Sequence, residues 1–418
     1  MGSKDAKSGK TDEPIFRLFS NGYKTGRDAY VYNFSKEACA ENARNMVDNY
    51  VGALEDLEKT LQEWKENPES QVELISIVDD ITQRHSSSLR WDSELKSRLR
   101  RQQPVGYSEG KLKRMQYRPF AKQYCYVEHL FAQRKYQLDS IFPECDSENR
   151  AICVPAVGSR RPFAALVVDT MPDLHFVEES CQCFPRYRYQ IRTGQQSLPG
   201  LGPPPERLDN ISETALRAFR AQHGDNGITK DAIFDYVYGV LHAPAYRERF
   251  ANDLAKDLPR IPFAADFQAF AEAGRRLSEL YLGYETCPQY PLGVEFIGPG
   301  EPRPEHHCIG ERAMRFADDE RTALTVNDHV RLVEIPPEAH EYEVNGRTPL
   351  EWFIDRYRIA RDRQSGIVND PNAWFDDPRD LIAAFRRIVH VSVETSRIVA
   401  SLPCPFPDSE GASGGEHR

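Results

Sequence analysis

One basic stretch carries the side chains of this sequence that are best suited to binding a polyanion. Residues 111–135 read KLKRMQYRPFAKQYCYVEHLFAQRK, and the wider window from Arg84 to Lys135 holds thirteen Lys and Arg against four acids. The window is +9 in a chain whose formal net charge is -10, which leaves -19 for the other residues. Lysine and arginine neutralise phosphates, and arginine can also form paired hydrogen bonds with base edges. The pattern predicts a surface for a nucleic acid, either DNA or RNA.

A solvated helix face is the alternative interpretation of these charges. Two features of the stretch argue against it. Its charge is nearly of one sign, whereas stabilising solvent-exposed faces mix signs at four-residue spacing. Aromatic side chains also run through it, at Tyr107, Tyr117, Phe120, Tyr124, Tyr126, Phe131 and Tyr136. Some of these rings must belong to a core, but the mixture favours a nucleic-acid surface.

Side-chain chemistry divides the candidate contacts of the stretch into two groups. A flexible ammonium suits a phosphate, which predicts that role for Lys111, Lys113 and Lys122. The planar arginine fork suits a guanine, which predicts tighter contacts for Arg114 and Arg118. The other basic candidates of the window are Arg98, Arg100, Arg101, Arg134 and Lys135.

Candidate metal ligands are sparse. Cys181-Gln-Cys183 lies downstream of His175, but structural zinc usually requires a second matching pair. The segment His306-His307-Cys308 is too distant in sequence to supply one. We therefore expect no metal site and reduced thiols for the nine cysteines.

A second set of possible ligands, Asp169, Asp173 and His175, follows an apolar strand. Such a trio is more often a turn whose side chains cap backbone groups. A diverged stand-alone enzyme that works through these residues nevertheless remains an alternative.

Motifs for catalysis or cofactor binding are missing where they would be diagnostic. SNGYKTGRD (20–28) resembles a phosphate loop but lacks the Gly-x4-Gly-Lys-Ser/Thr spacing. No Gly-x-Gly-x-x-Gly follows a strand, and no His-Glu-x-x-His is found. The Pro-Pro pairs in GPPPER and IPPEAH lack the aromatic residue that amino-methylating enzymes place beside a flipped base. We expect no catalytic residue and no cofactor in this chain.

Apolar periodicity predicts the elements that carry these residues. Gaps of three and four mark a long amphipathic helix over residues 34–64, while 72–80 fits either a strand or a helix start. Short apolar runs over 117–190 predict strands. After a Gly- and Pro-rich segment at 193–210, helices are expected near 229–258, with Thr229 as N-cap and Pro244 as a breaker.

Further elements complete the expected second half. We expect a helix over 265–285, strands over 326–344 that end at an Asn345-Gly346 turn, and a final helix over 378–402. The predicted fold class is α+β, with a β-rich basic N-terminal half that includes a long leading helix, followed by a mainly helical C-terminal half. The expected organisation is a disordered leader (1–14), a basic α+β part (15–192), a connector (193–210), a mainly helical part with a small sheet (211–402) and a disordered tail (403–418).

Several long segments resemble the C-terminal specificity domain of Type ISP restriction–modification enzymes. They include IFRLFSNGYKTGRDAYVYNFS, NRAICVPAVGSRRPFAALVVDTMPDLHF, DYVYGVLHAPAYRERFANDLAKDLPRIPF, YEVNGRTPLEWFIDRYRI and SGIVNDPNAW, in order over residues 15–403. The resemblance implies a target-recognition domain for double-stranded DNA. In this family the domain is joined to a nuclease, a translocase and an N6-adenine methyltransferase, which would hold S-adenosylmethionine.

The resemblance also implies DNA contacts outside the basic stretch. YRPFAKQ supports Arg118 and Lys122, and two further motifs supply Ser159, Arg160, Arg161, Gln182, Arg186 and Arg188. The segment ERAMRFADDERTAL departs from a lysine-rich stretch that family members often have, which puts a DNA contact there in doubt. A protein-interaction module, in which residues 211–290 dock on a methyltransferase or translocase, remains a further alternative. No run of about 18 apolar residues is present, so we expect no membrane span and a cytoplasmic location.

Overall fold

The computed structural model describes residues 1, 14–66, 73–86, 88–143, 147–177, 179–190, 205–312 and 314–406. The α-helices are α1 (Asp28–Val31), α2 (Lys36–Glu66), α3 (Leu74–Arg84), α4 (Ser93–Arg100), α5 (Glu213–His223), α6 (Lys230–His242), α7 (Pro244–Arg249), α8 (Ala251–Leu254), α9 (Phe267–Leu282), α10 (Pro349–Arg356) and α11 (Asp380–Ala400). Short 3₁₀ helices are η2 (Glu109–Lys111), η3 (Leu138–Ser140), η4 (Pro304–His307), η5 (Pro337–His340) and η6 (Pro371–Trp374).

The strands of the N-terminal half are β1 (Ser20–Asn21), β2 (Tyr32–Asn33), β3 (Leu112–Arg118), β4 (Ala121–Tyr126), β5 (Ala151–Pro155), β6 (Leu166–Val168), β7 (Cys181–Pro185) and β8 (Tyr187–Gln190). Those that follow are β9 (Glu206–Asp209), β10 (Gly293–Phe296), β11 (Arg315–Phe316), β12 (Leu324–Thr325), β13 (Val330–Val333), β14 (Ala360–Arg361) and β15 (Val368–Asn369). Helices and several small sheets are mixed, which confirms the predicted α+β class.

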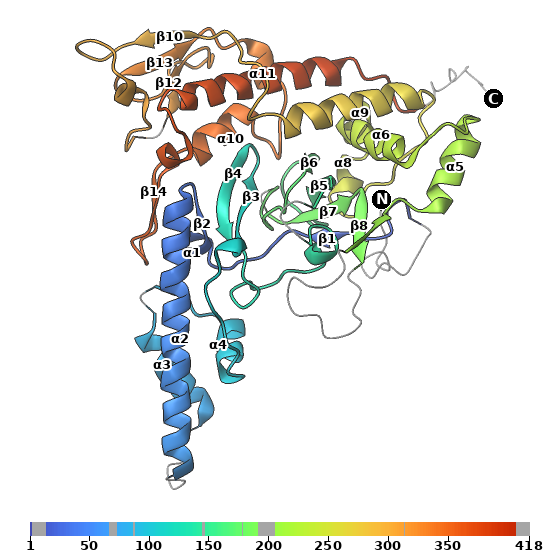
Figure 1. Ribbon diagram of the computed structural model, residues 1–418. Coiled ribbons are helices and arrows are strands. Elements are labelled where there is room, and N and C mark those ends of the chain that lie inside the picture. The colour runs from blue at the N-terminus through green and yellow to red at the C-terminus, as the bar shows by residue number, and fades with distance from the viewer. Residues whose placement is uncertain are drawn as a thin grey trace, which may run out of the picture.

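Helix α2 is the longest described element and projects from the rest of the molecule, with α3 and α4 beside it (Figure 1). Its buried residues recur every three or four positions, at Ala43, Met46, Val47, Tyr50, Ala53 and Leu57. This confirms the amphipathic helix predicted for 34–64. The ambiguous segment 72–80 is resolved as α3, because Ile77, Val78 and Ile81 bury one helical face.

An antiparallel sheet in the order β1-β7-β5-β6 forms the centre of the described chain. Every residue of β5, β6 and β7 is buried. Strands buried on both faces read as continuous apolar runs, which explains why AICVP and LVV lack alternation. A second sheet, β2-β4-β3, lies between this centre and α2 (Figure 1).

Helices α6 and α9 pack closely against each other, and α9 also packs against β6 of the central sheet. Gly239 and Gly274 permit the approach, because a side chain at either position would collide with a backbone carbonyl of the facing helix. The predicted signals of this region are confirmed. The Thr229 side chain accepts a hydrogen bond from the Ala232 amide, and α6 ends before Pro244, which begins α7.

The C-terminal part combines α10 and α11 with a sheet in the order β10-β13-β12-β11. Helix α11 confirms the final helix predicted for 378–402. Asn345 and Gly346 form the expected turn, with φ of 54° and 77°. The turn leads into the Thr348 cap of α10 rather than into a strand. Of the region predicted as strands, 326–344, only 330–333 form a strand, β13, and β12 ends just before the region.

Most of the predicted connector lies outside the described residues, but 206–209 form β9, paired with β8. Buried residues that precede the connector and buried residues that follow it belong to one hydrophobic cluster. The expected leader lies almost wholly outside the described residues. Of the expected tail, 403–406 are described, and Phe406 packs on Phe250 with ring centres 5.7 Å apart. Helices in the described ranges are too short or too polar to cross a bilayer.

Candidate nucleic-acid interface

The β3–β4 hairpin carries the densest part of the basic stretch. Arg118 pairs with Ala121 across a two-residue turn in which Phe120 has a φ of 57°. This turn position normally favours glycine, so a buried interaction must hold Phe120 there. Its ring packs edge-on against Tyr281 and Tyr284, with centres 5.1 and 5.9 Å away. The hairpin is therefore fixed to α9 and the segment that follows it.

A groove of about 540 Å³ lies beside β3, and we call it the β3 groove. Four cationic side chains and one carboxylate contribute to its wall. The lining residues are Lys36, Leu112, Lys113, Arg114, Met115, Lys122, Tyr124, Phe142, Asp169, Thr170 and Met171. A groove with this excess of positive charge suits an anionic polymer better than a neutral ligand.

Arg114 is the best-positioned arginine of this groove. Its guanidinium lies 4.6 Å from the centre of the Trp374 ring and donates to the Glu285 carboxylate at 2.8 Å. Tyr124, the cross-strand neighbour of Arg114, packs against the same indole ring, with ring centres 5.3 Å apart. The Arg114 side chain nevertheless keeps 49% of its surface exposed. It is thus oriented but still accessible.

The lysines of the β3 groove differ in how far their charge is compensated. Lys122 lies 3.1 Å from Glu285 and 3.9 Å from Asp169, and its side chain is 11% exposed. Lys113 is half-buried and forms no ion pair with any described residue. Lys113 therefore offers a less compensated charge than Lys122, although both were predicted to contact phosphate.

Arg118 requires a correction, because its side chain is only 11% exposed and is held by two carboxylates. Its guanidinium donates to Asp173 at 2.6 Å and lies 3.4 Å from Asp28. Asp173 also accepts hydrogen bonds from the Tyr32 hydroxyl and the His175 amide. Although burial opposes the charge, Asp173 raises the pKa of Arg118. A guanidinium held in this way is a structural group, and the predicted base contact does not fit its position.

Three other predicted contacts are tied to neighbouring groups. Arg98 donates to the backbone carbonyls of His129, Leu130 and Ala132, which fastens α4 to the segment after β4. Lys111 pairs with Glu128, whose side chain is nearly buried, and Lys135 pairs with Asp139. Their charges are partly neutralised, so the +9 of the window overstates the charge of the surface.

Arg100, Arg101 and Arg134 are exposed and form no ion pair with described residues. They remain available to a polyanion, and their predicted role stays a prediction. The loop between β5 and β6 presents a further exposed group. The Arg160 side chain is 92% exposed and Arg161 is exposed, while Ser159 is half-buried. Two hydrogen bonds hold this loop: the Gly158 amide donates to the Ala255 carbonyl, and the Asn345 side chain donates to the Pro162 carbonyl.

The QCFPRYRY motif also requires a correction. Gln182 is buried within β7, between β1 and β5. Arg186 is buried, and its guanidinium lies 2.7 Å from both Asp209 and Asp231. Although burial opposes the charge, these two carboxylates raise the pKa of Arg186. Arg188 is half-buried, and burial lowers its pKa. Gln182 and Arg186 therefore support the fold rather than a surface.

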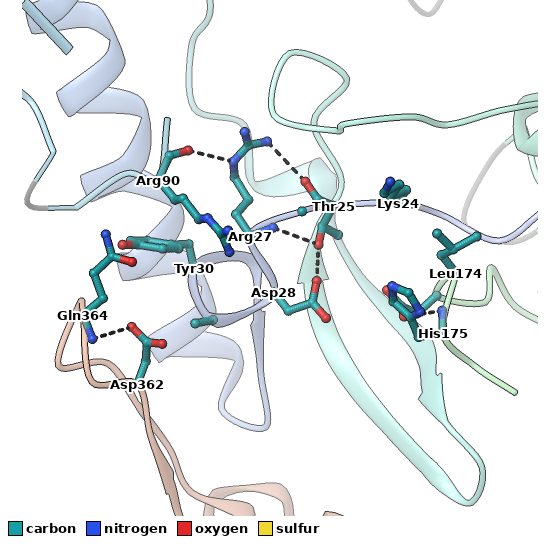
Figure 2. A pocket seen from close by; sticks show the side chains of 13 residues that line it. Lys24, Thr25, Arg27, Asp28, Tyr30, Arg90, Leu174, His175, Asp362 and Gln364 are labelled. Carbon is teal, nitrogen blue, oxygen red and sulfur yellow. Dashed lines mark hydrogen bonds between the residues drawn. The ribbon is translucent and has the colours of Figure 1, made fainter. Parts of the chain in front are cut away.

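A second cavity, of about 350 Å³, is lined by the SNGYKTGRD segment (Figure 2). Its arginine, Arg27, is buried and pairs with Asp92 at 2.9 Å. The Arg27 guanidinium also donates to the Phe131 carbonyl, and the Thr25 hydroxyl donates to Asp28. Figure 2 shows the Thr25–Asp28 contact and the hydrogen bonds from Arg27 to Thr25 and to the Arg90 carbonyl. The polar groups of the segment thus stabilise its own turn and attach it to the segments around Asp92 and Phe131.

The Asp173 carboxylate caps backbone and side-chain donors, as the turn interpretation of Asp169, Asp173 and His175 predicts. Within the described residues, a different group brings metal-ligating atoms together. Cys153 joins Cys181 and Cys183, and the three sulfur atoms lie within 4.8 Å of one another. Sequence spacing could not reveal this, because Cys153 reaches the pair only through the register of β5 and β7.

Sequence reasoning also missed Trp374, Glu285 and Lys36 as neighbours of the basic stretch. Trp374 was noticed only as the end of the SGIVNDPNAW motif, and 260 residues separate it from Arg114. No local spacing links residues so far apart. Only Lys36 could have been proposed from the sequence, because it is a basic residue at the start of the predicted long helix.

Comparison with known proteins gives a consistent result. Residues 14–384 match the family model of the Type ISP C-terminal specificity domain. No curated protein sequence matches the chain. Three solved structures are similar over nearly all of it.

The first structure is a nuclease-deletion mutant of the Type ISP restriction–modification enzyme LlaGI in complex with a DNA substrate mimic. It is 30% identical with a TM-score of 0.78, over 94% of this chain and 33% of that one. The second is the ATP-dependent Type ISP enzyme LlaBIII bound to DNA, 25% identical with a TM-score of 0.80, over 96% of this chain and 24% of that one. The third is a DrdV–DNA complex, 27% identical with a TM-score of 0.79, over 97% of this chain and 38% of that one.

The chain therefore spans between about a quarter and two fifths of the length of these proteins. The family match begins before β1 and ends within the first turns of α11, and so includes the hairpin, the β3 groove and the α6–α9 pair. The chain belongs to the family of Type ISP C-terminal specificity domains.

Proposed function

We propose that this chain recognises double-stranded DNA targets and so directs a Type ISP restriction–modification enzyme to its sites. The observation that carries the proposal is the family match over residues 14–384. It is supported by the likeness to LlaGI, LlaBIII and DrdV, each of which was solved with DNA or a DNA mimic.

The β3 groove supplies the chemistry that such a role needs. Arg114 rests on Trp374, which limits the rotamers that must be ordered when a base edge is bound. A guanine presents two acceptors in the major groove and would replace the carboxylate of Glu285 as partner of the guanidinium. Lys113 and the exposed Arg100, Arg101 and Arg134 would set the register by contacting phosphates.

The catalytic partner in this proposal is an N6-adenine methyltransferase domain or subunit. That partner would hold S-adenosylmethionine, extrude the target adenine and transfer the methyl group, as enzymes that act on bases within a duplex do. This chain would determine where the extrusion takes place. A cytoplasmic location follows, because the DNA substrate and the methyl donor meet there.

The experiment is a selection from random duplexes with the purified 418-residue chain, followed by affinity measurements on the enriched and scrambled sequences. We expect one enriched sequence family, bound at least about 10³-fold more tightly than scrambled DNA. The chain alone should transfer no methyl group from S-adenosylmethionine. Binding without any enriched sequence, or methyl transfer by the chain alone, would contradict a recognition role.

A further inference from the structure

Three cysteines form a buried cluster at the centre of the fold, away from the β3 groove. Cys181 and Cys183 are two residues apart on β7, so their side chains point to the same face of the sheet. Cys153 lies directly opposite Cys183 in the β5–β7 register. All three side chains are fully buried, and all three thiols are free.

The spacing of the sulfur atoms fits a shared metal ion. The Cys153 and Cys183 sulfurs are 3.4 Å apart, and those of Cys181 and Cys183 are 3.8 Å apart. Zinc–thiolate bonds of about 2.3 Å at tetrahedral angles place sulfur atoms roughly 3.8 Å apart. A cluster built only for packing gains little from this arrangement, because thiols are weak donors and weak acceptors.

An oxygen donor lies at the edge of the cluster. The backbone carbonyl oxygen of Asp173 is 3.3 Å from the Cys181 sulfur. Zinc–oxygen bonds of about 2.1 Å would place a fourth tetrahedral ligand roughly 3.5 Å from a sulfur. Gly22 leaves room for both atoms, because a side chain there would meet the Cys181 sulfur at 2.8 Å and also collide with the Asp173 carbonyl.

We propose that Cys153, Cys181 and Cys183 bind one thiophilic divalent ion, such as zinc, in a closed structural site. Binding would release one proton from each thiol and form three metal–sulfur bonds. The S–H contacts of Cys153 with Cys183, and of Cys181 with Asp173, would be replaced. No water position is required, since the cysteines are buried, and this favours a structural over a catalytic site.

Two other states of the same residues compete with the metal. Neutral thiols in a hydrogen-bonded row would need no ion. Cys153 and Cys183 could instead form a disulfide across β5 and β7, with loss of two electrons and two protons to a thiol oxidant. Each alternative makes a different prediction for metal content and for thiol count.

The test uses the full chain, unfolded with reductant and refolded with cobalt(II) as a spectroscopic substitute for zinc. We expect one equivalent to bind and to produce a thiolate-to-cobalt charge-transfer band that zinc abolishes. Cys181→Ala should lose the band. Cys39→Ala is the matched control, because Cys39 is also fully buried and also bonds a backbone carbonyl, at Val31, outside the cluster.

A second measurement uses the unmodified chain, so that the proposal can still be tested if Cys181→Ala fails to fold. The unmodified chain should retain one zinc per molecule after refolding with zinc and gel filtration, and its thermal midpoint should exceed that of chain refolded with a chelator. Absence of the band together with absence of retained zinc would overturn the proposal. Mass spectrometry that finds a Cys153–Cys183 disulfide in protein refolded with metal and reductant would do so as well.

Discussion

Arg114 and Arg118 lie four residues apart on the same strand, yet the structure uses them in opposite ways. Arg114 keeps half of its side-chain surface exposed, above Trp374 and beside Glu285. The Arg118 side chain is only 11% exposed and is held between Asp173 and Asp28. A positive charge in the sequence thus marks either a surface that can meet a polyanion or an internal ion pair, and the location of the acids decides which.

The same distinction applies to the rest of the molecule. Arg186 is buried and has two carboxylate partners, whereas Arg100, Arg101 and Arg134 are exposed without described ion pairs. A buried cation without acids must lose its charge or remain costly. His242 illustrates the first outcome, since burial lowers its pKa to about 3.

The largest effect on stability is expected when Arg118, at the end of β3, is replaced by a neutral residue. Arg118→Ala leaves Asp173 as a buried carboxylate without its principal partner, which should lower the free energy of unfolding by about 3–5 kcal/mol. Urea denaturation at neutral pH measures this. Arg275→Ala is the control, because Arg275 is an exposed arginine paired with two glutamates and should cost less than about 1 kcal/mol.

A double variant sharpens the same comparison. Arg118→Met with Asp173→Asn removes both charges, and it should recover most of the stability that Arg118→Ala loses. If the single and double variants are equally unstable, the loss comes from packing of the side chain and not from the unpaired carboxylate.

A pH effect of intermediate size is expected from His242. Its imidazole is fully buried near Arg247, and its Nδ1–H donates to the Tyr238 carbonyl. The unfolded chain, with a histidine pKa of about 6.5, binds more protons than the folded chain between about pH 3 and 6.5. Stability from this group is therefore complete above pH 6.5 and decreases as the pH falls, by roughly 2 kcal/mol at about pH 5.

His242→Gln removes this titration while it keeps a hydrogen-bonding side chain. Urea denaturation of both proteins at about pH 7.5 and about pH 5 should show the difference between them shrink at the lower pH by roughly 2 kcal/mol. An unchanged difference would mean that the imidazole becomes protonated inside the fold without penalty.

The elements that sequence reasoning located correctly depend on local signals. Helices α2, α9 and α11 have apolar residues at helical spacing, and Thr229, Pro244 and the Asn345-Gly346 turn act within a few residues of their position. The fold class followed from these signals. Residues 206–209 lie in the predicted connector but form a strand, and their pairing with β8 depends on a partner outside the local pattern.

The site could be predicted only in part, because ion pairing is long-range. Asp173 is 55 residues from Arg118, and Asp231 is 45 residues from Arg186. Glu285, three residues beyond α9, reaches Lys122. The basic window includes the hairpin and most of the cations of the β3 groove, but it could not separate residues that meet solvent from residues that meet an acid.

The exposed end of β3 should affect DNA binding rather than stability. Arg114→Ala should cost about 1–3 kcal/mol in binding to the selected sequence and much less on scrambled DNA. Arg114→Lys is the matched control for charge, because it keeps the cation and loses the planar fork. It should retain the salt dependence of binding and still lose discrimination. Equal losses on both DNAs would assign Arg114 to phosphate contact instead.

The smallest effect is expected from Lys113, which lines the β3 groove without a described ion pair. If its ammonium contacts one phosphate, Lys113→Ala should lower the slope of log affinity against log salt by about 0.9 on every duplex. Arg217→Ala removes the same charge from α5, which lies on the far side of the molecule from β3 (Figure 1), and should leave the slope unchanged. The measurement is fluorescence anisotropy of a labelled duplex over a series of salt concentrations. If both variants change the slope equally, the effect reflects net charge and the β3 groove is not the contact surface. A change for Lys113→Ala alone would place the DNA backbone along the exposed end of β3, where Arg114 can reach a base edge.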